Sequence, residues 1–248
     1  MIPIKTEEEI MIMQEGGRIL SRIIKNLKRF IKKGISTYQI DEFASELMAK
    51  EKVVSAFKGY RGFPANICTS VNEEVVHGIP LKEKILKEGD IISVDVGIIY
   101  KDFYLDTAFT IPIGRIKPQI KKLISVTYKA LFEGIKKAKP NNYLTDISHS
   151  IQSFVERHGF SVVRQFVGHG IGRLMHEEPE IPNFGRAGGG PILKKGMVLA
   201  IEPMVNIGTY EVEIAPNGWT AITKDRLYSA HFEHTVAITD GRPIILTI

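Results

Sequence analysis

Four acidic residues and one histidine stand in apolar or glycine-bounded segments of this 248-residue chain, where a lone charge is costly to bury. They are Asp95, Asp106, His169, Glu202 and Glu233. An unpaired carboxylate in a buried strand faces a desolvation penalty of roughly several kcal/mol, so it either meets a cation or stays protonated. Because three of the acids fall in strongly apolar runs, the pattern indicates a shared cation and makes all five residues candidate metal ligands.

The ligand types in this set indicate which metals and which reaction to expect. Four carboxylates and one imidazole offer more oxygen than one tetrahedral zinc ion takes, and they suit two divalent ions of the Mn, Fe or Co type. Two such ions lower the pKa of a bound water and polarise a carbonyl group, which is the chemistry of amide hydrolysis. A zinc-protease helix is not expected at His176-Glu177-Glu178-Pro179, because proline would break it.

Short strands must position these side chains. Asp95 and Asp106 fall on two successive predicted strands, 90–99 and 103–111, which a turn joins into a hairpin. Strands are also predicted at 197–206, which contains Glu202, and at 231–239, which contains Glu233 and begins at His231. We expect His231 to lie beside Glu233, and the glycines around His169 to let the backbone approach a ligand closely.

The remaining elements repeat one order, two helices and then strands. A capping box, Thr6 with Glu9, predicts a first helix that ends before Gly34. The other predicted helices are 37–50, 118–138 and 145–158, and the other predicted strands are 53–57, 65–71, 161–167, 211–214, 219–222 and 243–247. We therefore expect one catalytic domain over residues 1–248, with similar halves at about 1–112 and 113–248. Its class is α+β, a mainly antiparallel sheet covered by helices.

Composition restricts the surroundings and partners of the protein. The hydrophobic fraction is 44%, and no apolar run approaches the ~18 residues that a membrane helix needs. The single cysteine, Cys68, excludes an intrachain disulfide framework and fits a reducing compartment. With no secretory signal in the sequence, we expect a cytoplasmic protein. The net charge is +5, and the basic faces, such as Lys25, Lys28, Arg29, Lys32 and Lys33, are either solvated or in contact with the ribosome.

Six motifs in order resemble those of the type I methionine aminopeptidases. They are Phe57–Pro64, Asn72–Pro80, Ser93–Gly97, Gly168–Gly172, Ile201–Met204 and Phe232–Thr235. The resemblance runs nearly end to end and implies the pita-bread fold, with two pseudo-symmetric halves. It also implies an enzyme that removes the initiator methionine from the N-termini of nascent polypeptides when the second residue is small. Nothing in the chain requires an oligomer, so we expect a monomer.

The resemblance also implies how the five ligands divide their work. Asp95 would chelate one ion, Asp106 and Glu233 would bridge both, and His169 and Glu202 would complete the other. Glu202 would in addition act as general base toward a metal-bridging water.

Further site residues follow from the same resemblance. His77 and His176 would contact the substrate backbone and the carbonyl oxygen of the scissile amide. The methionine side chain would occupy a pocket lined by Phe57, Tyr60, Phe63, Cys68, Met175 and Trp219. At positions 57, 63 and 175 the chain departs from the commonest bacterial pattern, but each change keeps the wall apolar. A monovalent cation is implied near Asn72, Glu74 and Ser229.

Two other functions are compatible with such a fold. A proline-specific aminopeptidase uses a similar ligand set, but those enzymes carry a large extra N-terminal domain, for which 248 residues leave no room. A nonenzymatic relative that binds RNA or ribosomes would lose metal ligands, whereas this sequence retains all five. We therefore expect a methionine aminopeptidase of type I.

Overall fold

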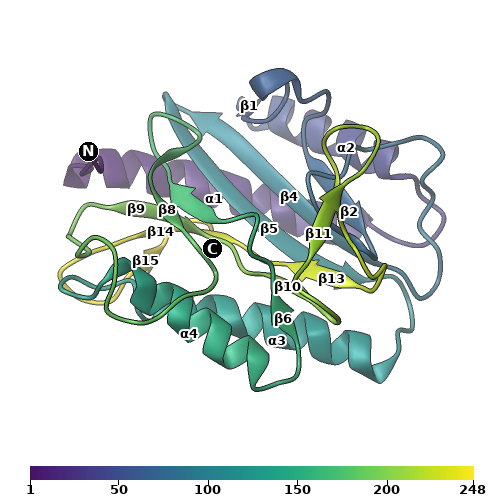
Figure 1. The fold of residues 1–248 in the computed structure, drawn as a ribbon. Coiled ribbons are helices and arrows are strands. Elements are labelled where there is room, and N and C mark those ends of the chain that lie inside the picture. The colour runs from purple at the N-terminus through teal and green to yellow at the C-terminus, as the bar shows by residue number, and fades with distance from the viewer.

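The computed structural model describes residues 1–248, in which four α-helices cover antiparallel sheets (Figure 1). The helices are α1 (Glu7–Phe30), α2 (Thr37–Lys50), α3 (Pro118–Ile135) and α4 (Leu144–Glu156). The predicted capping box begins α1, with reciprocal hydrogen bonds between Thr6 and Glu9. The helix ends at Phe30, before Gly34 as predicted, because Ile31 is extended and the Gly34 N–H donates to the carbonyl of Leu86.

The strands of the first half surround one long hairpin, β4 with β5, and all strand pairs in the molecule are antiparallel. The first-half strands are β1 (Val54–Ser55), β2 (Cys68–Val71), β3 (Glu74–Val76), β4 (Ile91–Tyr100) and β5 (Phe103–Pro112). The second-half strands are β6 (Ser161–Val162), β7 (Gly168–Gly170), β8 (Glu177–Ile181), β9 (Val198–Ile201), β10 (Met204–Asn206), β11 (Val212–Ile214), β12 (Ala221–Thr223), β13 (Ser229–His231), β14 (His234–Ala237) and β15 (Ile244–Ile245).

Three strands, β3, β7 and β8, are absent from the prediction, and β13 overlaps a predicted strand only at His231. β3 has only three residues and follows Asn72, whose φ of 56° marks a tight turn. β8 is rich in glutamate and contains Pro179, a composition that argues against a strand. It forms because β8 lies at the edge of the sheet β15-β14-β9-β7-β8, where proline is tolerated.

The predicted strands 197–206 and 231–239 are wrong as continuous strands, because the first breaks in its middle, at 202–203, and the second breaks near its start, at 232–233. β9 pairs with β14 up to Ile201 opposite His234, and β10 pairs with β13 from Met204 opposite His231. The two breaks therefore face each other, and Pro203, which has no N–H to donate, lies in one of them.

The helices hold these sheets from outside. α1 packs on β4 and β5, while α3 packs on α4 and on the second-half strands β10 and β13 (Figure 1). Apolar side chains of both halves meet in one buried cluster. The expected α+β class with mainly antiparallel sheet is confirmed. None of the helices combines the length and apolar character that crossing a membrane requires.

Candidate active site

The β4–β5 hairpin brings Asp95 and Asp106 to one point, as its sequence predicts. Asp95 pairs with Ala108 and Gly97 pairs with Asp106, so the two aspartates are diagonal neighbours on one face. Gly97 is needed there, since a Cβ at this position would approach Phe57 Cε1 to 2.6 Å. The hairpin thus supplies two carboxylates and also a surface against which an aromatic ring packs.

The two facing strand breaks supply the other carboxylates. Glu202 follows the last residue of β9, and Glu233 lies between β13 and β14. The Glu233 N–H donates to the Ala108 carbonyl at 3.0 Å, and Thr107 Oγ1 donates to the Glu233 carbonyl at 2.6 Å. Glu233 is therefore tied to β5, the strand that carries Asp106.

His169 on β7 faces the same acids. Its Nδ1 lies 2.8 Å from the Gly170 carbonyl, to which the ring donates, so Nε2 is left with its lone pair. Nε2 lies 3.7 Å from Glu202 Oε1. Burial, followed by the nearby His176, lowers the pKa of His169 to about 3, so the imidazole is neutral at physiological pH. A neutral imidazole is the form that ligates a metal.

Burial raises the pKa of all four carboxyl groups in the absence of a cation. Desolvation is the largest cause in each, and it raises the pKa of Asp106 to about 7 and that of Glu202 to about 8. The pKa values of Asp95 and Glu233 rise well above the usual range, because repulsion by Asp106 adds to desolvation. The site would therefore gain free energy from a bound divalent cation.

The donor atoms fit such a cation. One atom each of Asp106, His169 and Glu233 lies within 4.8 Å of the others, all three residues being buried. Asp95 Oδ1, Asp106 Oδ1 and Glu233 Oε1 are buried without any hydrogen-bond partner in the protein. Buried oxygens without partners are rare unless an ion or water satisfies them, so these residues can hold metal.

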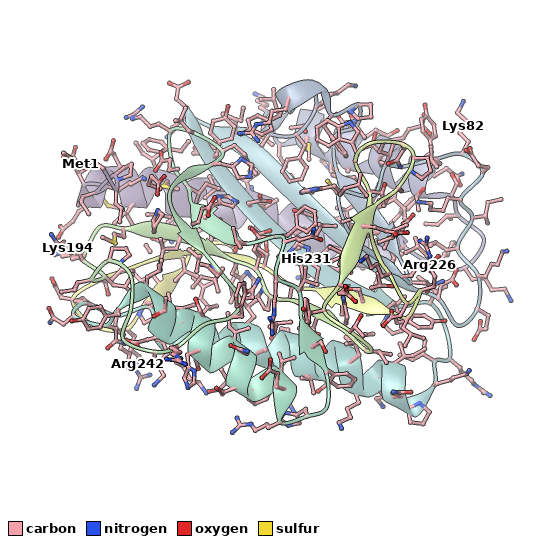
Figure 2. All side chains as sticks on the ribbon, viewed as in Figure 1. Met1, Lys82, Lys194, Arg226, His231 and Arg242 are labelled. Carbon is pink, nitrogen blue, oxygen red and sulfur yellow. The ribbon has the colours of Figure 1, made fainter.

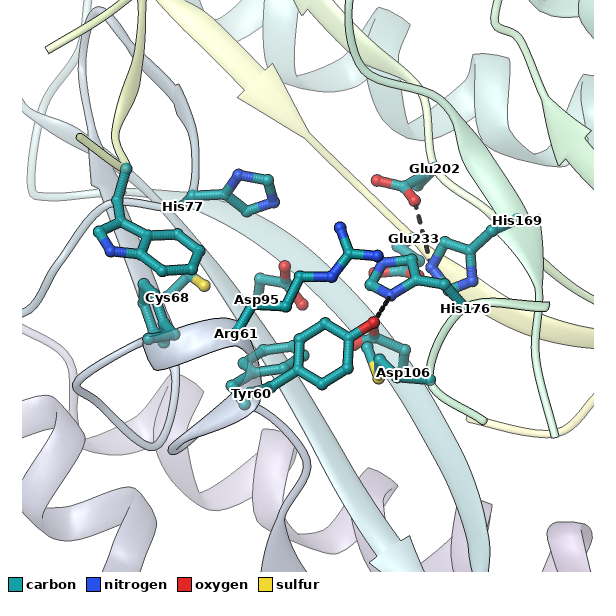
Figure 3. Close-up of a pocket in the computed structure, with 14 residues that line it drawn as sticks. Tyr60, Arg61, Cys68, His77, Asp95, Asp106, His169, His176, Glu202 and Glu233 are labelled. Atoms are coloured by element: carbon teal, nitrogen blue, oxygen red, sulfur yellow. Dashed lines mark hydrogen bonds and ion pairs between the residues drawn. The ribbon is translucent and has the colours of Figure 1, made fainter. Parts of the chain in front are cut away.

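Two further histidines lie at this cluster (Figure 3). His77 is held in a left-handed conformation, φ 58°, and the following Gly78 donates to Ser70 Oγ. Burial, followed by repulsion from His231 and His176, lowers the pKa of His77 to about 4. The imidazole is therefore neutral at physiological pH and faces the cavity on a constrained backbone.

His176 lies on the other side, with its ring centroid 4.3 Å from that of His169. Its Nδ1 is 2.8 Å from the hydroxyl of Tyr60. Burial, and then the charge of Arg61, lowers the pKa of His176. If the Tyr60 hydroxyl donates to Nδ1, Nε2 carries the hydrogen and can donate to a ligand.

Apolar side chains form another wall of the cavity that the acids and histidines line. This apolar wall is made by Phe57, Tyr60, Phe63, Cys68, Met175 and Trp219. Phe63 and Trp219 contact edge to face with centroids 5.2 Å apart. Burial raises the pKa of the Cys68 thiol well above its usual range, so Cys68 is a neutral wall residue. The cavity of about 160 Å³ is small and suits one side chain.

The structure thus gathers every predicted ligand, histidine and wall residue into one cavity, and it adds Arg61 to them. Arg61 is the only lysine or arginine that lines the cavity, and its φ of 48° lies between two glycines with positive φ. The pair Gly59 and Gly62 is the signal in the sequence for this unusual turn. β13 ends at His231 and Glu233 lies beyond it, so the two residues do not share one strand as expected. His231 Nε2 lies 3.4 Å from Glu202 Oε2.

The predicted monovalent-cation residues lie together, but the carboxylate of Glu74 is already engaged. Its Oε1 accepts from Lys84 Nζ at 2.6 Å, and its Oε2 accepts from the Val71 N–H at 2.7 Å. The Ser229 N–H donates to the Asn72 carbonyl at 2.8 Å. Each oxygen of the Glu74 carboxylate therefore already accepts one hydrogen bond.

Comparisons with known proteins agree with this geometry. Residues 11–240 match the model of metallopeptidase family M24. Methionine aminopeptidase of Clostridium acetobutylicum is 52% identical, and methionine aminopeptidase 1 of Bacillus subtilis is 49% identical, each over 100% of this chain and 99% of the relative.

Solved structures give the same result. The crystal structure of methionine aminopeptidase from Thermotoga maritima superimposes with a TM-score of 0.98 at 47% identity, over 100% of this chain and 99% of that one. A prolidase from Pyrococcus horikoshii, at 20% identity and a TM-score of 0.79, covers 99% of this chain and 63% of its own, and shares the fold. The chain therefore has the pita-bread fold and belongs to metallopeptidase family M24, within it to the methionine aminopeptidases.

Proposed function

We propose that this protein removes the N-terminal methionine from nascent polypeptides when the second residue is small. The observation that carries the proposal is the single cavity in which an apolar wall meets five metal-ligand side chains. An apolar wall suits an unbranched thioether side chain. Two divalent ions of the Mn, Fe or Co type, held by Asp95, Asp106, His169, Glu202 and Glu233, would activate a water and polarise the scissile carbonyl.

Glu202 is the residue to which we assign proton transfer. Its two oxygens lie near different histidines, Oε1 at 3.7 Å from His169 Nε2 and Oε2 at 3.4 Å from His231 Nε2. A buried carboxylate in this position can take a proton from the attacking water and pass it to the leaving amine. The backbone N–H of His231 donates to Thr110 Oγ1, which fixes this histidine on β13 beside Glu202.

His77 and His176 are the proposed contacts to the substrate backbone. A neutral His176 that receives the Tyr60 hydroxyl on Nδ1 presents Nε2–H to the carbonyl oxygen, which becomes an oxyanion. His77 would contact the backbone beyond the scissile bond. Bulk at the second residue would collide near these two rings, which explains a requirement for a small side chain there.

Other features belong to the same proposal. Residues 1–248 act as one catalytic domain and as a monomer, in the cytoplasm. Exposed basic side chains at the periphery, such as Lys82, Lys194, Arg226 and Arg242, are available for contact with the ribosome (Figure 2). A monovalent cation near Asn72, Glu74 and Ser229 would be held partly by backbone oxygens.

Three peptides test the proposal when the protein is loaded with Mn, Co or Fe. We expect methionine to be released from Met-Ala-Ser but not from Met-Leu-Ser, whose second residue is bulky, and Gly-Pro-Ser to stay intact. Free amino acids are measured by chromatography. Release of glycine from Gly-Pro-Ser with Met-Ala-Ser untouched would favour the proline-specific alternative and overturn the proposal.

A further inference from the structure

A buried ion pair outside the active site joins the N-terminal segment to the chain just after His176. Lys5 Nζ pairs with Glu177 Oε2, and the two side chains are only 4% and 6% exposed. The backbone of Lys5 is also fixed, because its N–H donates to the Gly196 carbonyl at 2.8 Å. Lys5 is therefore fixed both at its backbone and at its ammonium group.

The second oxygen of Glu177 organises the segment that precedes it. Oε1 accepts from the backbone N–H groups of Arg173 at 2.8 Å and of Leu174 at 3.2 Å. Residues 171–176 form neither helix nor strand, so these bonds replace a regular ladder. The same six residues carry Met175 and His176, which both line the active-site cavity.

Gly172 shows how closely Lys5 approaches this segment. A Cβ at Gly172 would clash with Lys5 Cε and would lie 2.9 Å from Glu177 Oε1. The glycine therefore leaves the space that the lysine side chain fills. The Gly172 carbonyl accepts from the Tyr104 N–H at 2.8 Å, so the segment is fixed to β5 at its start and to Lys5 at its end.

We infer that Lys5 is a positioning residue for the reaction, which acts through Glu177 on His176 and Met175. A buried ion pair whose two partners make further hydrogen bonds is held in one geometry. An exposed pair such as Arg173 with Glu9 contributes little to stability. Without Lys5, Glu177 keeps its strand pairing with Gly170, but its carboxylate loses the ammonium group that holds it against the N–H groups of residues 173 and 174, and both cavity residues shift. The inference rests on the proposed function, because it assigns a consequence to the placement of the His176 ring.

The test compares Lys5→Met and the neutral double variant Lys5→Met/Glu177→Gln with wild type, all metal-loaded. The amide oxygen introduced by Glu177→Gln would still accept the two backbone N–H groups, so the double variant lacks only the tie to the N-terminal segment. We expect kcat for Met-Ala-Ser to fall about 10- to 100-fold with a smaller change in KM, as a displacement of about 1 Å would cause.

Selectivity gives a readout that loss of folded protein cannot move. The ratio of kcat/KM for Met-Ala-Ser to that for norleucine-Ala-Ser is independent of the amount of active enzyme. We expect this ratio to change at least about twofold in both variants, because the Met175 wall moves. Lys195→Ala is the matched control, since Lys195 pairs with Glu7 and Asp240 at the surface near the same terminus.

The outcomes separate the inference from the function on which it rests. If wild type does not cleave Met-Ala-Ser, the proposed function fails. If wild type cleaves it and the variants keep the wild-type kcat per active site and the wild-type ratio, as Lys195→Ala should, Lys5 has no positioning role. Should Lys5→Met fail to fold because Glu177 is left without its cation, the double variant decides.

Discussion

The two halves of the molecule supply the proposed metal-ligand side chains in different ways. The first half places Asp95 and Asp106 within two unbroken ten-residue strands of one hairpin. The second half places Glu202 and Glu233 where paired strands break, and His169 beside a register shift between β7 and β8. An unbroken strand directs every second side chain to one face, whereas a break lets a side chain leave the pleat and turn into the cavity.

The facing breaks explain why rigidity is not lost in the second half. Backbone hydrogen bonds from Glu233 to Ala108 and from Phe232 to the Pro203 carbonyl bridge the gap. The ladder also resumes on either side, with β9 on β14 and β10 on β13. The first half is thus rigid through regular pairing, and the second through specific contacts around an interruption. Each part of this contrast can be tested.

The largest effect is expected at the break itself, from Glu202→Gln. The amide keeps the size of the side chain but cannot take a proton, so kcat for Met-Ala-Ser should fall by about 10²- to 10⁴-fold. Turnover is measured as methionine released per active site. Glu180→Gln, on the exposed edge of β8, is the control and should stay near wild type. A Glu202→Gln enzyme within about tenfold of wild type would remove the proton-transfer role.

The next largest effect is the pH dependence of stability in metal-free protein, to which buried carboxyl groups of both halves contribute. Unfolded carboxyl groups have pKa values near 4 and have lost their protons by about pH 7, whereas folded Asp106 and Glu202, with pKa values of about 7 and about 8, retain protons there. The folded state thus binds more protons, so the free energy of unfolding should fall as pH rises from about 7 to 8.5. The slope is about 1.4 kcal/mol per pH unit for each proton retained.

The buried histidines do not contribute to the pH dependence of the free energy of unfolding between about pH 7 and 8.5. Their folded pKa values are lowered, to about 3 for His169 and about 4 for His77, so above about pH 7 they are mostly neutral in both states. Urea unfolding in the presence of a chelator measures the slope, and Asp106→Asn should reduce it. A stability that rises with pH in the metal-free protein would contradict the proposed burial of the acids. Added Mn²⁺ should stabilise the protein more at about pH 8.5 than at about pH 7.

A smaller effect is expected from Pro203→Ala, which restores an N–H within the break. The new donor allows the ladder to continue and turns Glu202 away from its present direction, so kcat should fall about tenfold. The free energy of unfolding should change by no more than about 1 kcal/mol. Pro112→Ala, at the exposed end of β5, is the control in the first half. If both variants match wild type in kcat, the break does not depend on proline.

The smallest effects are expected in the apolar wall, to which both halves contribute. Phe63→Tyr and Met175→Phe replace one large apolar or aromatic side chain by another of similar size. Each should change kcat/KM for Met-Ala-Ser by less than about fivefold, or about 1 kcal/mol. A loss of kcat/KM above about tenfold in either variant would contradict this prediction and show that the apolar wall does not tolerate a change in side-chain shape.

The sequence by itself determined much of the site, because the signals are local. Capping residues and apolar periodicity located the four helices to within a few residues, and the turn at Tyr100-Lys101-Asp102 predicted the hairpin that joins Asp95 to Asp106. Acids within apolar runs indicated metal, and six motifs indicated the family. Each of these signals spans only a few residues, the range over which backbone preference and side-chain patterning act.

Only the tertiary structure decided what depends on contacts between distant segments. Apolar runs around Glu202 and Glu233 predicted continuous strands, and the facing breaks appear only when the two runs are paired. The contact of His231 with Glu202 follows from that pairing, and the place of Arg61 in the cavity depends on how the turn at Gly59–Gly62 packs against the site. The pair Lys5 with Glu177 joins residues 172 positions apart. Neither residue carries a local signal for the other, because burial and partner choice are properties of the assembled fold.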